Sequence, residues 1–537
     1  MVLHGIRTSG GLLGRRKSSG TRLRAAGECS GTPWGAPGAQ EGAGGVRGLH
    51  NPIFDTVMAA CLELMPITNY SDLLYTGLTR YLDYPNASPD AIRALATTLL
   101  VEKFSIADPE ELLDPHELVA DSTALHCISG MLISRLDFEY KLRSLRAQCF
   151  SLFLQTDQPP LELEPLVCAI SLWSHNHEYI SSWSPGEDEA LQELCSRIDG
   201  ALGSANCTPE LIGLPLALCA MYQSLNESPY STAIGSYHPT DWPSSLQPLM
   251  QRLIYDFQEE TVLTNSVAAL QNIEAESSIK VRNLYEGNPY PRWLGIRVAT
   301  HAAPFNKVRS YPEAFNLGAV LKSKGQDPER FVGPQQMLIA GCGTGREPIG
   351  LQTQIQDLNI LAVDLSRRSI AYGKKMARKY SADSVQFLHA DILALENLEQ
   401  KFDIIQSSGV LHHMKDPVAG LSVLRKRIRD NGLIRLGLYS QRARATIHRI
   451  SGQHEDGHPP STVDEIRALR NRILSGEIAN QEDVNMLTTF NDFFSTSGCR
   501  DMLCHVQDHD FTPLDIHELC DAAQLEFLGF VEPKEGI

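Results

Sequence analysis

Three glycines and two aspartates in the second half of the sequence have the spacing of a site for a nucleoside-containing cofactor. Gly341, Gly343 and Gly345 stand in the loop Gly-Cys-Gly-Thr-Gly. Glycine lets the chain turn sharply and lets a ligand approach the backbone closely, and a following helix offers free N–H groups at its start. Asp364 comes next and can accept hydrogen bonds from both hydroxyls of a ribose. Asp391 is then placed to meet an adenine amine.

A pair of adjacent histidines, His412 and His413, offers acid–base chemistry. Imidazole titrates near neutral pH, so either ring can take a proton from an attacking oxygen or nitrogen. The alternative interpretation is that the histidines pack in the interior or cap the next helix. The sequence leaves both interpretations open.

Short apolar segments that alternate with helical ones must position these residues. Such alternation indicates βαβ units and a parallel sheet, and right-handed crossovers then give a doubly wound, Rossmann-like α/β fold. Asp364 and Asp391 would end the second and third strands. The predicted strands are 335–341, 359–365, 385–391, 402–408 and 433–439.

The glycine loop resembles that of class I S-adenosylmethionine methyltransferases, and the resemblance extends over about 335–440. The loop has the form G-x-G-x-G, and Arg346 stands where the dinucleotide fingerprint has its last glycine. The resemblance implies that S-adenosylmethionine is the cofactor. Its methionine part would lie over Gly341, Cys342, Gly343 and Gly345. Its ribose would lie beside Asp364 and Leu365, and its adenine beside Asp391 and Ile392.

The segment FDIIQSSGVLHHMKDP (402–417) looks like part of small-molecule-type methyltransferases, which often reads VLHH followed by Asp-Pro. This resemblance implies that Ser407, Ser408 and Gly409 lie beside the sulfonium. The segment lacks the Asn-Pro-Pro-Tyr or Asp-Pro-Pro-Tyr motif of enzymes that methylate nucleic-acid amines, and the Pro-Cys pair of cytosine methyltransferases is missing as well. A protein or a small molecule is therefore the expected methyl acceptor.

An earlier segment, NLYEGNPYPRW (283–293), resembles the Tyr-Glu-x-Asn-Pro-Tyr-Pro-Arg-Trp segment of methyltransferases that have an N-terminal tetratricopeptide-like helical region. Tyr290 and Trp293 would give rigid apolar cover to a site that must exclude water. Arg292 could pair with the carboxylate of the cofactor. The alternative is that these three residues join the helical region to the sheet.

The rest of the chain divides by composition and periodicity. Residues 1–57 form a basic leader, either disordered or resembling a transit peptide. Residues 58–260 show apolar spacing typical of helices and predict an all-α domain. A diverged helical-repeat array, which would bind a protein partner, stays open. Residues 261–334 connect to the cofactor domain (335–440), and 441–537 hold a helical insertion and the final strand region.

The C-terminus departs from the family pattern. Methyltransferase sheets normally finish with two more strands, the last one antiparallel and beside the fifth. Residues 525–531 can form the first of these, but six residues are too few for a turn and a second strand. Either 501–507 takes the place of the missing strand or the chain is truncated, and a missing strand would leave a sheet edge unpaired at a cost in stability.

Composition limits the remaining classes of function. The net charge of -17 argues against bulk binding to nucleic acid, which needs clustered cations. No apolar run is long enough to span a membrane. The 12 cysteines form no C-x-x-C pair, which favours buried reduced thiols and a cytoplasmic location, although import directed by the leader is the alternative.

These observations predict an S-adenosylmethionine-dependent methyltransferase that needs no metal and modifies a protein or a small molecule. A second hypothesis is an interaction protein whose helical region binds a partner while the methyltransferase domain binds cofactor with little or no activity. A nicotinamide dehydrogenase is disfavoured because Arg346 replaces the last glycine of the fingerprint.

Overall fold

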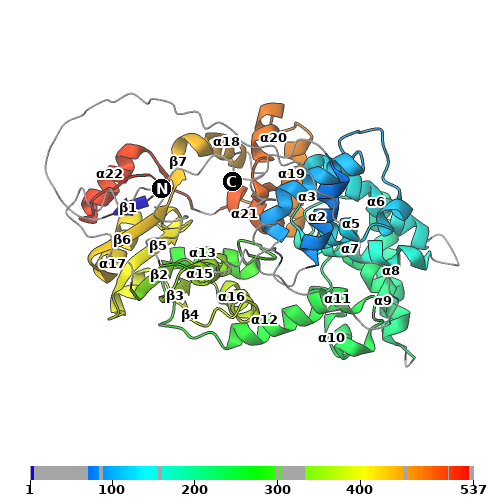
Figure 1. The fold of residues 1–537 in the computed structure, drawn as a ribbon, viewed down its shortest axis with the longest axis horizontal. Helices are drawn as coiled ribbons and strands as arrows, with labels where there is room; N and C mark the ends of the chain where they lie inside the picture. Colours follow the sequence, from blue (N-terminus) through cyan, green and yellow to red (C-terminus); the bar gives the residue numbers. More distant parts are fainter. Residues whose placement is uncertain are drawn as a thin grey trace, which may run out of the picture.

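The computed structural model shows a helical body beside a sheet that is flanked by helices (Figure 1). It describes residues 2–4, 70–83, 87, 89–154, 160–204, 206–296, 302–304, 333–452, 458–505 and 507–530. The predicted architecture, an all-α region followed by a Rossmann-like α/β domain, is therefore confirmed. Most of the predicted leader and much of the predicted connection lie outside the described residues.

A six-stranded sheet has the order β1-β6-β5-β2-β3-β4. Strands β2 to β6 are parallel, and β1 runs antiparallel to β6. The chain moves outward from β2 to β4 and then returns to the other side of β2, so the order reverses there and leaves a crevice at the carboxyl ends of the strands. The strands are β1 (Val2–His4), β2 (Gln335–Ala340), β3 (Leu358–Asp364), β4 (Val385–His389), β5 (Phe402–Ser408) and β6 (Ile428–Gly437).

Each face of the sheet is buried by its own set of helices. Met337 and Ile339 of β2 pack toward α15 and α16, whereas Leu338 and Ala340 pack toward α17 and α22. This alternation follows from the two-residue period of a strand. Both faces are apolar because both are covered, as in other parallel sheets. The helices are α15 (Arg346–Gln354), α16 (Arg367–Lys379), α17 (Pro417–Arg427) and α22 (Pro513–Ala522).

The N-terminal helical body has one continuous apolar core, which includes the fully buried Trp173 and Trp242. Local signals set its helix starts. Helix α8 begins at Pro185. Ser184, the residue before it, forms a reciprocal capping box with Glu187 in the first turn. The helices are α2 (Asp72–Leu82), α3 (Pro89–Lys103), α4 (Pro115–Val119), α5 (Ser122–Gly130), α6 (Leu136–Leu154), α7 (Glu164–Asn176), α8 (Pro185–Leu202), α9 (Pro209–Ala220) and α10 (Ser231–Ile234).

One long helical segment runs from this body to the sheet. It consists of α11 (Gln247–Met250), a π-helical turn (Gln251–Tyr255) and α12 (Asp256–Asn265). Helix α12 packs on α16, and Lys375 of α16 pairs with Glu260 at 2.5 Å. Helix α13 (Glu276–Gly287) follows and leads into the segment that covers the glycine loop.

The helices that follow the sheet pack on the N-terminal helical body (Figure 1). They are α18 (Gln441–Ser451), α19 (Val463–Leu474), α20 (Gln481–Leu487) and α21 (Thr496–Leu503). Their core includes Ile180, which comes from the N-terminal body. Arg470 of α19 also forms a buried ion pair with Glu139 of α6, at 2.6 and 2.8 Å. A two-residue pairing of β7 (Tyr439–Ser440) with β8 (Asp510–Phe511) ties this region back to β6.

The prediction for the last strands is wrong. Residues 501–503 continue α21, because Ser495 caps this helix and the apolar residues that follow are buried at helical spacing. Leu525 packs in the core beside α22, and none of residues 525–530 belongs to a strand of either sheet. The antiparallel neighbour of β6 comes instead from Val2–His4, three residues of the expected disordered leader. The fifth predicted strand is confirmed but begins at Ile428, earlier than expected.

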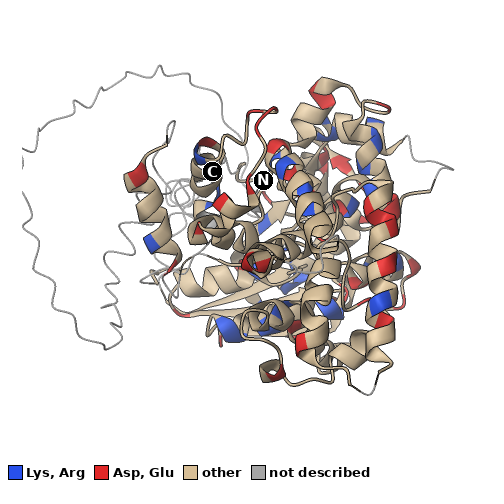
Figure 2. Cartoon of the chain, turned by 90° about the vertical axis from the view of Figure 1, so that its right-hand side faces the viewer, with Lys and Arg blue, Asp and Glu red and all other residues tan. Residues whose placement is uncertain are grey.

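None of the described helices has the length and apolar character needed to cross a bilayer. On the side of the molecule drawn in Figure 2, basic and acidic segments are interspersed along the same helices.

Candidate functional site

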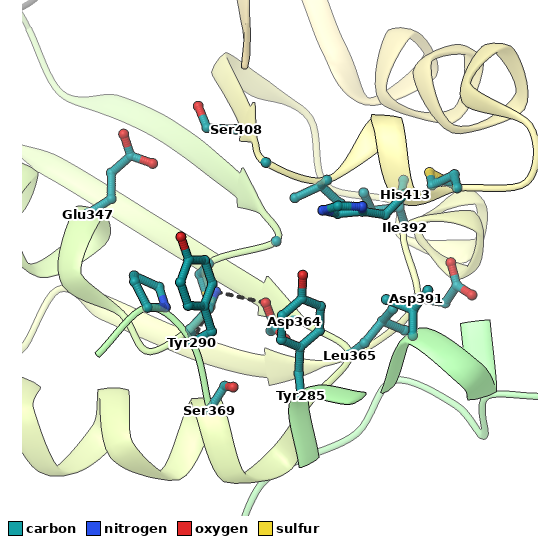
Figure 3. Close-up of a pocket in the computed structure, with 18 of the residues that line it drawn as sticks. Tyr285, Tyr290, Glu347, Asp364, Leu365, Ser369, Asp391, Ile392, Ser408 and His413 are labelled. Atoms are coloured by element: carbon teal, nitrogen blue, oxygen red, sulfur yellow. Dashed lines mark hydrogen bonds between the residues drawn. The ribbon is translucent and has the colours of Figure 1, made fainter. Parts of the chain in front are cut away.

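A cavity of about 1550 Å³ opens at the carboxyl ends of β2, β3, β4 and β5. Ligand pockets for single small molecules typically have about 300–1,000 Å³, so this cavity has room for a cofactor together with part of a second molecule. The segments after the strands form its base, and α13 with the following segment forms its cover (Figure 3).

The glycine loop is packed so closely, by Val410 after β5 and by the cover, that side chains are excluded at two of its positions. Gly341 has a φ of +85°, and a Cβ there would stand 2.1 Å from Cγ2 of Val410. Gly343 has a φ of +51°, and its Cβ would stand 2.6 Å from the carbonyl oxygen of Tyr290. Glycine is required for both reasons, since L-residues rarely adopt a positive φ. Both glycines and Cys342, which the sequence analysis assigns to the cofactor, line the cavity.

Asp364 is held at the end of β3 by the loop itself. Its Oδ2 accepts a hydrogen bond from the Gly343 N–H at 2.7 Å, and its Oδ1 accepts one from the Ser366 N–H at 2.9 Å (Figure 3). Burial raises the pKa of Asp364 to about 6, although these N–H donors act in the opposite direction. The carboxylate is therefore fixed in position on the cavity wall.

The wall continues past the ends of β3 and β4 with a mixture of polar and apolar residues. Leu365, Asp391 and Ile392, which the sequence analysis assigns to the cofactor, all line the cavity. Oδ1 of Asp391 accepts a hydrogen bond from the Leu393 N–H at 2.9 Å, which orients the carboxylate. A flat apolar contact beside an oriented acceptor is the arrangement that an adenine ring and its amine would need.

Gly345 and Ser407 are predicted site residues that do not line the cavity. A Cβ on Gly345 would stand 2.9 Å from the Gly373 Cα, so this glycine allows α15 and α16 to approach each other. The Ser407 hydroxyl donates to the Ala340 carbonyl at 3.0 Å inside the sheet, whereas Ser408 lines the cavity. Successive residues of a strand point to opposite sides, so the two serines cannot share a role.

Arg292 and Trp293 also turn away from the cavity. Nη2 of Arg292 lies 2.7 Å from Nε2 of His175 in the helical body, and the Trp293 indole donates to the Thr344 hydroxyl at 3.0 Å. Trp293 is 1% exposed and belongs to the sheet core. These contacts correct the expected pairing of Arg292 with the cofactor and agree with the alternative, a joint between helical body and sheet. Tyr290 does line the cavity.

The two histidines have different surroundings. His412 lies outside the cavity lining, and its ring stacks on Tyr439 with 3.6 Å between centroids. Burial lowers the pKa of His412 to about 2, so this ring is neutral. His413 lines the cavity, but Asp508 holds its Nδ1 at 2.8 Å, and its Nε2 lies 3.1 Å from Nε2 of His412.

The group around His413 contains ligand types that can bind a metal. The ligand atoms of His413, His505 and Asp508 lie within 4.8 Å of one another. Asp508 Oδ1 is however shared by both histidines, and Oδ2 accepts from the Arg444 guanidinium at 2.7 Å. The positive charge of Arg444 would repel a metal ion. Its hydrogen bond also occupies Oδ2 of Asp508, an oxygen that could otherwise bind the metal. Neighbouring donors also lower the pKa of Asp508 well below its usual range. The expectation that the site needs no metal stays a prediction.

A second part of the cavity wall carries residues that the sequence analysis did not select. Tyr285, Tyr439 and Asp501 line the cavity together with Tyr290. Tyr285 donates to Asp501 Oδ1 at 2.6 Å, and Tyr439 donates to Oδ2 at 3.2 Å. Tyr285 and Tyr439 lie in segments for which a resemblance was found, but no motif indicated that they would meet Asp501 from a distant part of the chain.

The cover is attached to the start of α16. The Glu286 carboxylate accepts hydrogen bonds from the backbone N–H groups of Arg367 at 2.6 Å and Arg368 at 3.2 Å. An acid at this position also interacts favourably with the helix dipole. Tyr285, next to Glu286, is thereby held over the cavity.

Residues 338–434 match the family model described as "Methyltransferase domain". The chain carries a methyltransferase domain. This domain belongs to the class I fold that uses S-adenosylmethionine, and the site fits that cofactor. The positions of Gly341 and Gly343 exclude any Cβ, and Asp364 and Asp391 present fixed carboxylates at successive strand ends.

The domain is similar to curated proteins from several bacteria. An uncharacterized protein of Synechococcus is 26% identical over 41% of this chain, and the match spans about half (52%) of that relative. An uncharacterized methyltransferase of Mycobacterium bovis is 27% identical over 27% of this chain and 80% of the relative. A malonyl-[acyl-carrier protein] O-methyltransferase of Paenibacillus is 26% identical over 23% of this chain and 47% of the relative.

Two solved structures are similar to parts of the chain. The structure of PKMT2 from Rickettsia typhi in complex with AdoHcy is 20% identical, with a TM-score of 0.31, and the match covers 41% of this chain and 44% of that one. Magnesium protoporphyrin IX methyltransferase from Synechocystis is 19% identical, with a TM-score of 0.23, over 36% and 86% of the two chains.

Proposed function

We propose that this protein transfers a methyl group from S-adenosylmethionine to a protein or a small molecule. The observation that carries the proposal is the cradle formed by Gly341, Gly343 and Asp364 on the wall of a cavity large enough for a second reactant. The cofactor supplies a methyl group activated by a positively charged sulfur.

The residues of the chain have distinct parts in this proposal. The glycine loop admits the methionine part close to its backbone, Asp364 accepts the ribose hydroxyls, and Asp391 meets the adenine amine. Leu365 and Ile392 give the adenine apolar contact. Ser408, the last residue of β5, and Gly409, which follows it, border the reacting centre.

Catalysis in this site relies on alignment and on exclusion of water. Both ring nitrogens of His413 already have partners, and His412 is buried away from the cavity. Neither ring presents a free nitrogen to an acceptor, which disfavours the hypothesis of a histidine base. Methyl transfer to a good nucleophile needs chiefly correct placement of the reacting atoms, and the cover formed by α13 and Tyr290 shields that placement from solvent.

Calorimetric titration of the full chain with S-adenosylhomocysteine, with NAD as the control ligand, tests the proposal. We expect binding in the micromolar range for S-adenosylhomocysteine and none for NAD. A folded chain that binds neither ligand would contradict the proposal and favour the hypothesis of an interaction protein.

A further inference from the structure

Asp501 is a buried carboxylate on the wall of the cavity. It is 6% exposed, and it projects from α21 toward the cover and the end of β6. Each of its oxygens accepts one hydrogen bond from a tyrosine, Oδ1 from Tyr285 at 2.6 Å and Oδ2 from Tyr439 at 3.2 Å. The carboxylate is therefore held in one orientation while its edge stays part of the cavity surface.

The charge of Asp501 is not balanced by a cation within the described part of the chain. None of the ion pairs found there includes Asp501, whereas the nearby Asp508 pairs with the Arg444 guanidinium at 2.7 Å. Hydrogen bonds from neutral phenols offset part of the cost of burying a carboxylate. A bound cation would offset the rest, so the site is suited to a positively charged ligand.

The tyrosine rings beside Asp501 also favour a positively charged ligand. The rings of Tyr285 and Tyr290 are stacked at 6.4 Å and stand side by side over the cavity (Figure 3). Aromatic faces attract cations. Burial raises the pKa of both tyrosines well above its usual range, so they remain neutral.

We propose that Asp501, with Tyr285 and Tyr290, binds the ammonium form of an aliphatic amine, which makes amines the class of methyl acceptor. This inference rests on the proposed function. An ammonium nitrogen has no lone pair, so one N–H bond must break before the nitrogen can act as a nucleophile. The carboxylate of Asp501 is positioned to accept that proton.

The experiment has to distinguish an amine acceptor from two other ligands of Asp501, a carboxylate acceptor and the cofactor itself. A carboxylate acceptor would meet the negative charge of Asp501 directly, and its binding would be unfavourable. The cofactor itself carries an ammonium group, and S-adenosylhomocysteine retains it. If Asp501 binds that group, replacing Asp501 would weaken binding of S-adenosylhomocysteine.

The experiment is calorimetric titration of the full chain, saturated with S-adenosylhomocysteine, with three probes of equal length: n-butylamine, n-butanol and butyrate. We expect n-butylamine to bind at least about tenfold more tightly than the other two. Asp501→Asn should remove this preference and leave the affinity for S-adenosylhomocysteine unchanged. The matched control is Asp492→Asn, because Asp492 also accepts from a tyrosine, Tyr290 at 2.9 Å, but lies outside the cavity lining.

Equal affinity for the three probes in the unmodified chain would overturn the inference, even if Asp501→Asn fails to fold. So would a loss of affinity for S-adenosylhomocysteine in a folded Asp501→Asn variant. Failure of S-adenosylhomocysteine to bind the unmodified chain would instead contradict the proposed function. An acetylated Gly-Lys-Gly amide then distinguishes the source of the amine: tighter binding than n-butylamine indicates a protein acceptor, and weaker binding a small molecule.

Discussion

The two sides of the cavity are built in different ways. The cofactor side consists of neighbouring loops at the ends of β2, β3 and β4, so its residues lie between Gly341 and Ile392. The acceptor side brings together Tyr285 before the sheet, Tyr439 after β6 and Asp501 on α21. The first side is fixed by one supersecondary unit. The second depends on how the helical regions pack against the sheet.

The two sides should therefore respond differently to substitution. Changes on the cofactor side act on local backbone geometry and should alter affinity for S-adenosylhomocysteine. Changes on the acceptor side act on contacts between distant segments and should leave that affinity almost unchanged.

Gly343→Ala should break the cofactor side most severely. The substitution adds backbone strain of about 1–3 kcal/mol at a positive φ and places a Cβ 2.6 Å from the Tyr290 carbonyl oxygen. We expect affinity for S-adenosylhomocysteine to fall about 100-fold in calorimetry. Gly186→Ala is the control, because nothing lies within 4 Å of a Cβ there. Equal binding by both variants would show that the loop is not the cradle.

Asp364→Asn keeps the shape of the side chain and removes its charge. Hydrogen bonds to a charged group are worth about 1.5–3 kcal/mol, so we expect affinity for S-adenosylhomocysteine to fall about 10- to 100-fold. The melting temperature in the absence of ligand should also fall slightly, because both carboxylate oxygens accept backbone N–H groups and the amide nitrogen of asparagine cannot accept the second of these bonds. Unchanged affinity in this variant would rule out Asp364 as the ribose ligand.

His413→Phe tests a part of the cavity wall that lies outside the cofactor side. Phenylalanine can preserve the stacking of His413 on His505, whose ring centroids lie 3.6 Å apart, but it removes the donor to Asp508. We expect the free energy of unfolding to fall by about 1–3 kcal/mol, measured by urea denaturation, with affinity for S-adenosylhomocysteine within about twofold of the parent. His448→Phe is the control, since His448 is half-exposed where it meets Asp510. A large loss of cofactor affinity in His413→Phe would remove the distinction between the two sides.

The pH dependence of binding gives a smaller, graded test of the cofactor side. Burial raises the pKa of Asp364 from 3.8 to about 6, so the free protein loses the anionic acceptor as the pH falls below about 6. We expect affinity for S-adenosylhomocysteine to fall about tenfold between pH 7 and pH 5. Asp364→Asn should show a flat profile over this range. The raised pKa also implies that the contribution of Asp364 to stability falls as the pH rises from 3.8 to about 6.

The sequence predicted those parts of the fold and site that depend on local rules. Five strands follow from apolar segments between helices, and Asp364 follows from its place at the end of one of them. Ser407 was assigned wrongly because the pattern locates a strand end better than the direction in which each side chain points. Arg292 and Trp293 fit a motif, but the Arg292 side chain contacts the helical body and Trp293 packs in the sheet core. Asp501 was not selected, because its role depends on contacts with residues far away in the sequence.

The buried pair between Glu139 and Arg470 has a mechanical consequence for the acceptor side. It joins α19, and the core that α19 shares with α21, to the N-terminal helical body. Asp501 therefore lies on a helix that is joined to that body, whereas Tyr439 follows β6 almost directly. A tilt of one part against the other would change the distance between this tyrosine and the carboxylate, whereas Asp364 and the glycine loop lie together within the sheet domain. The acceptor site therefore spans the joint between the helical body and the sheet. We expect a partner that binds the helical body to change the affinity of this site for the methyl acceptor.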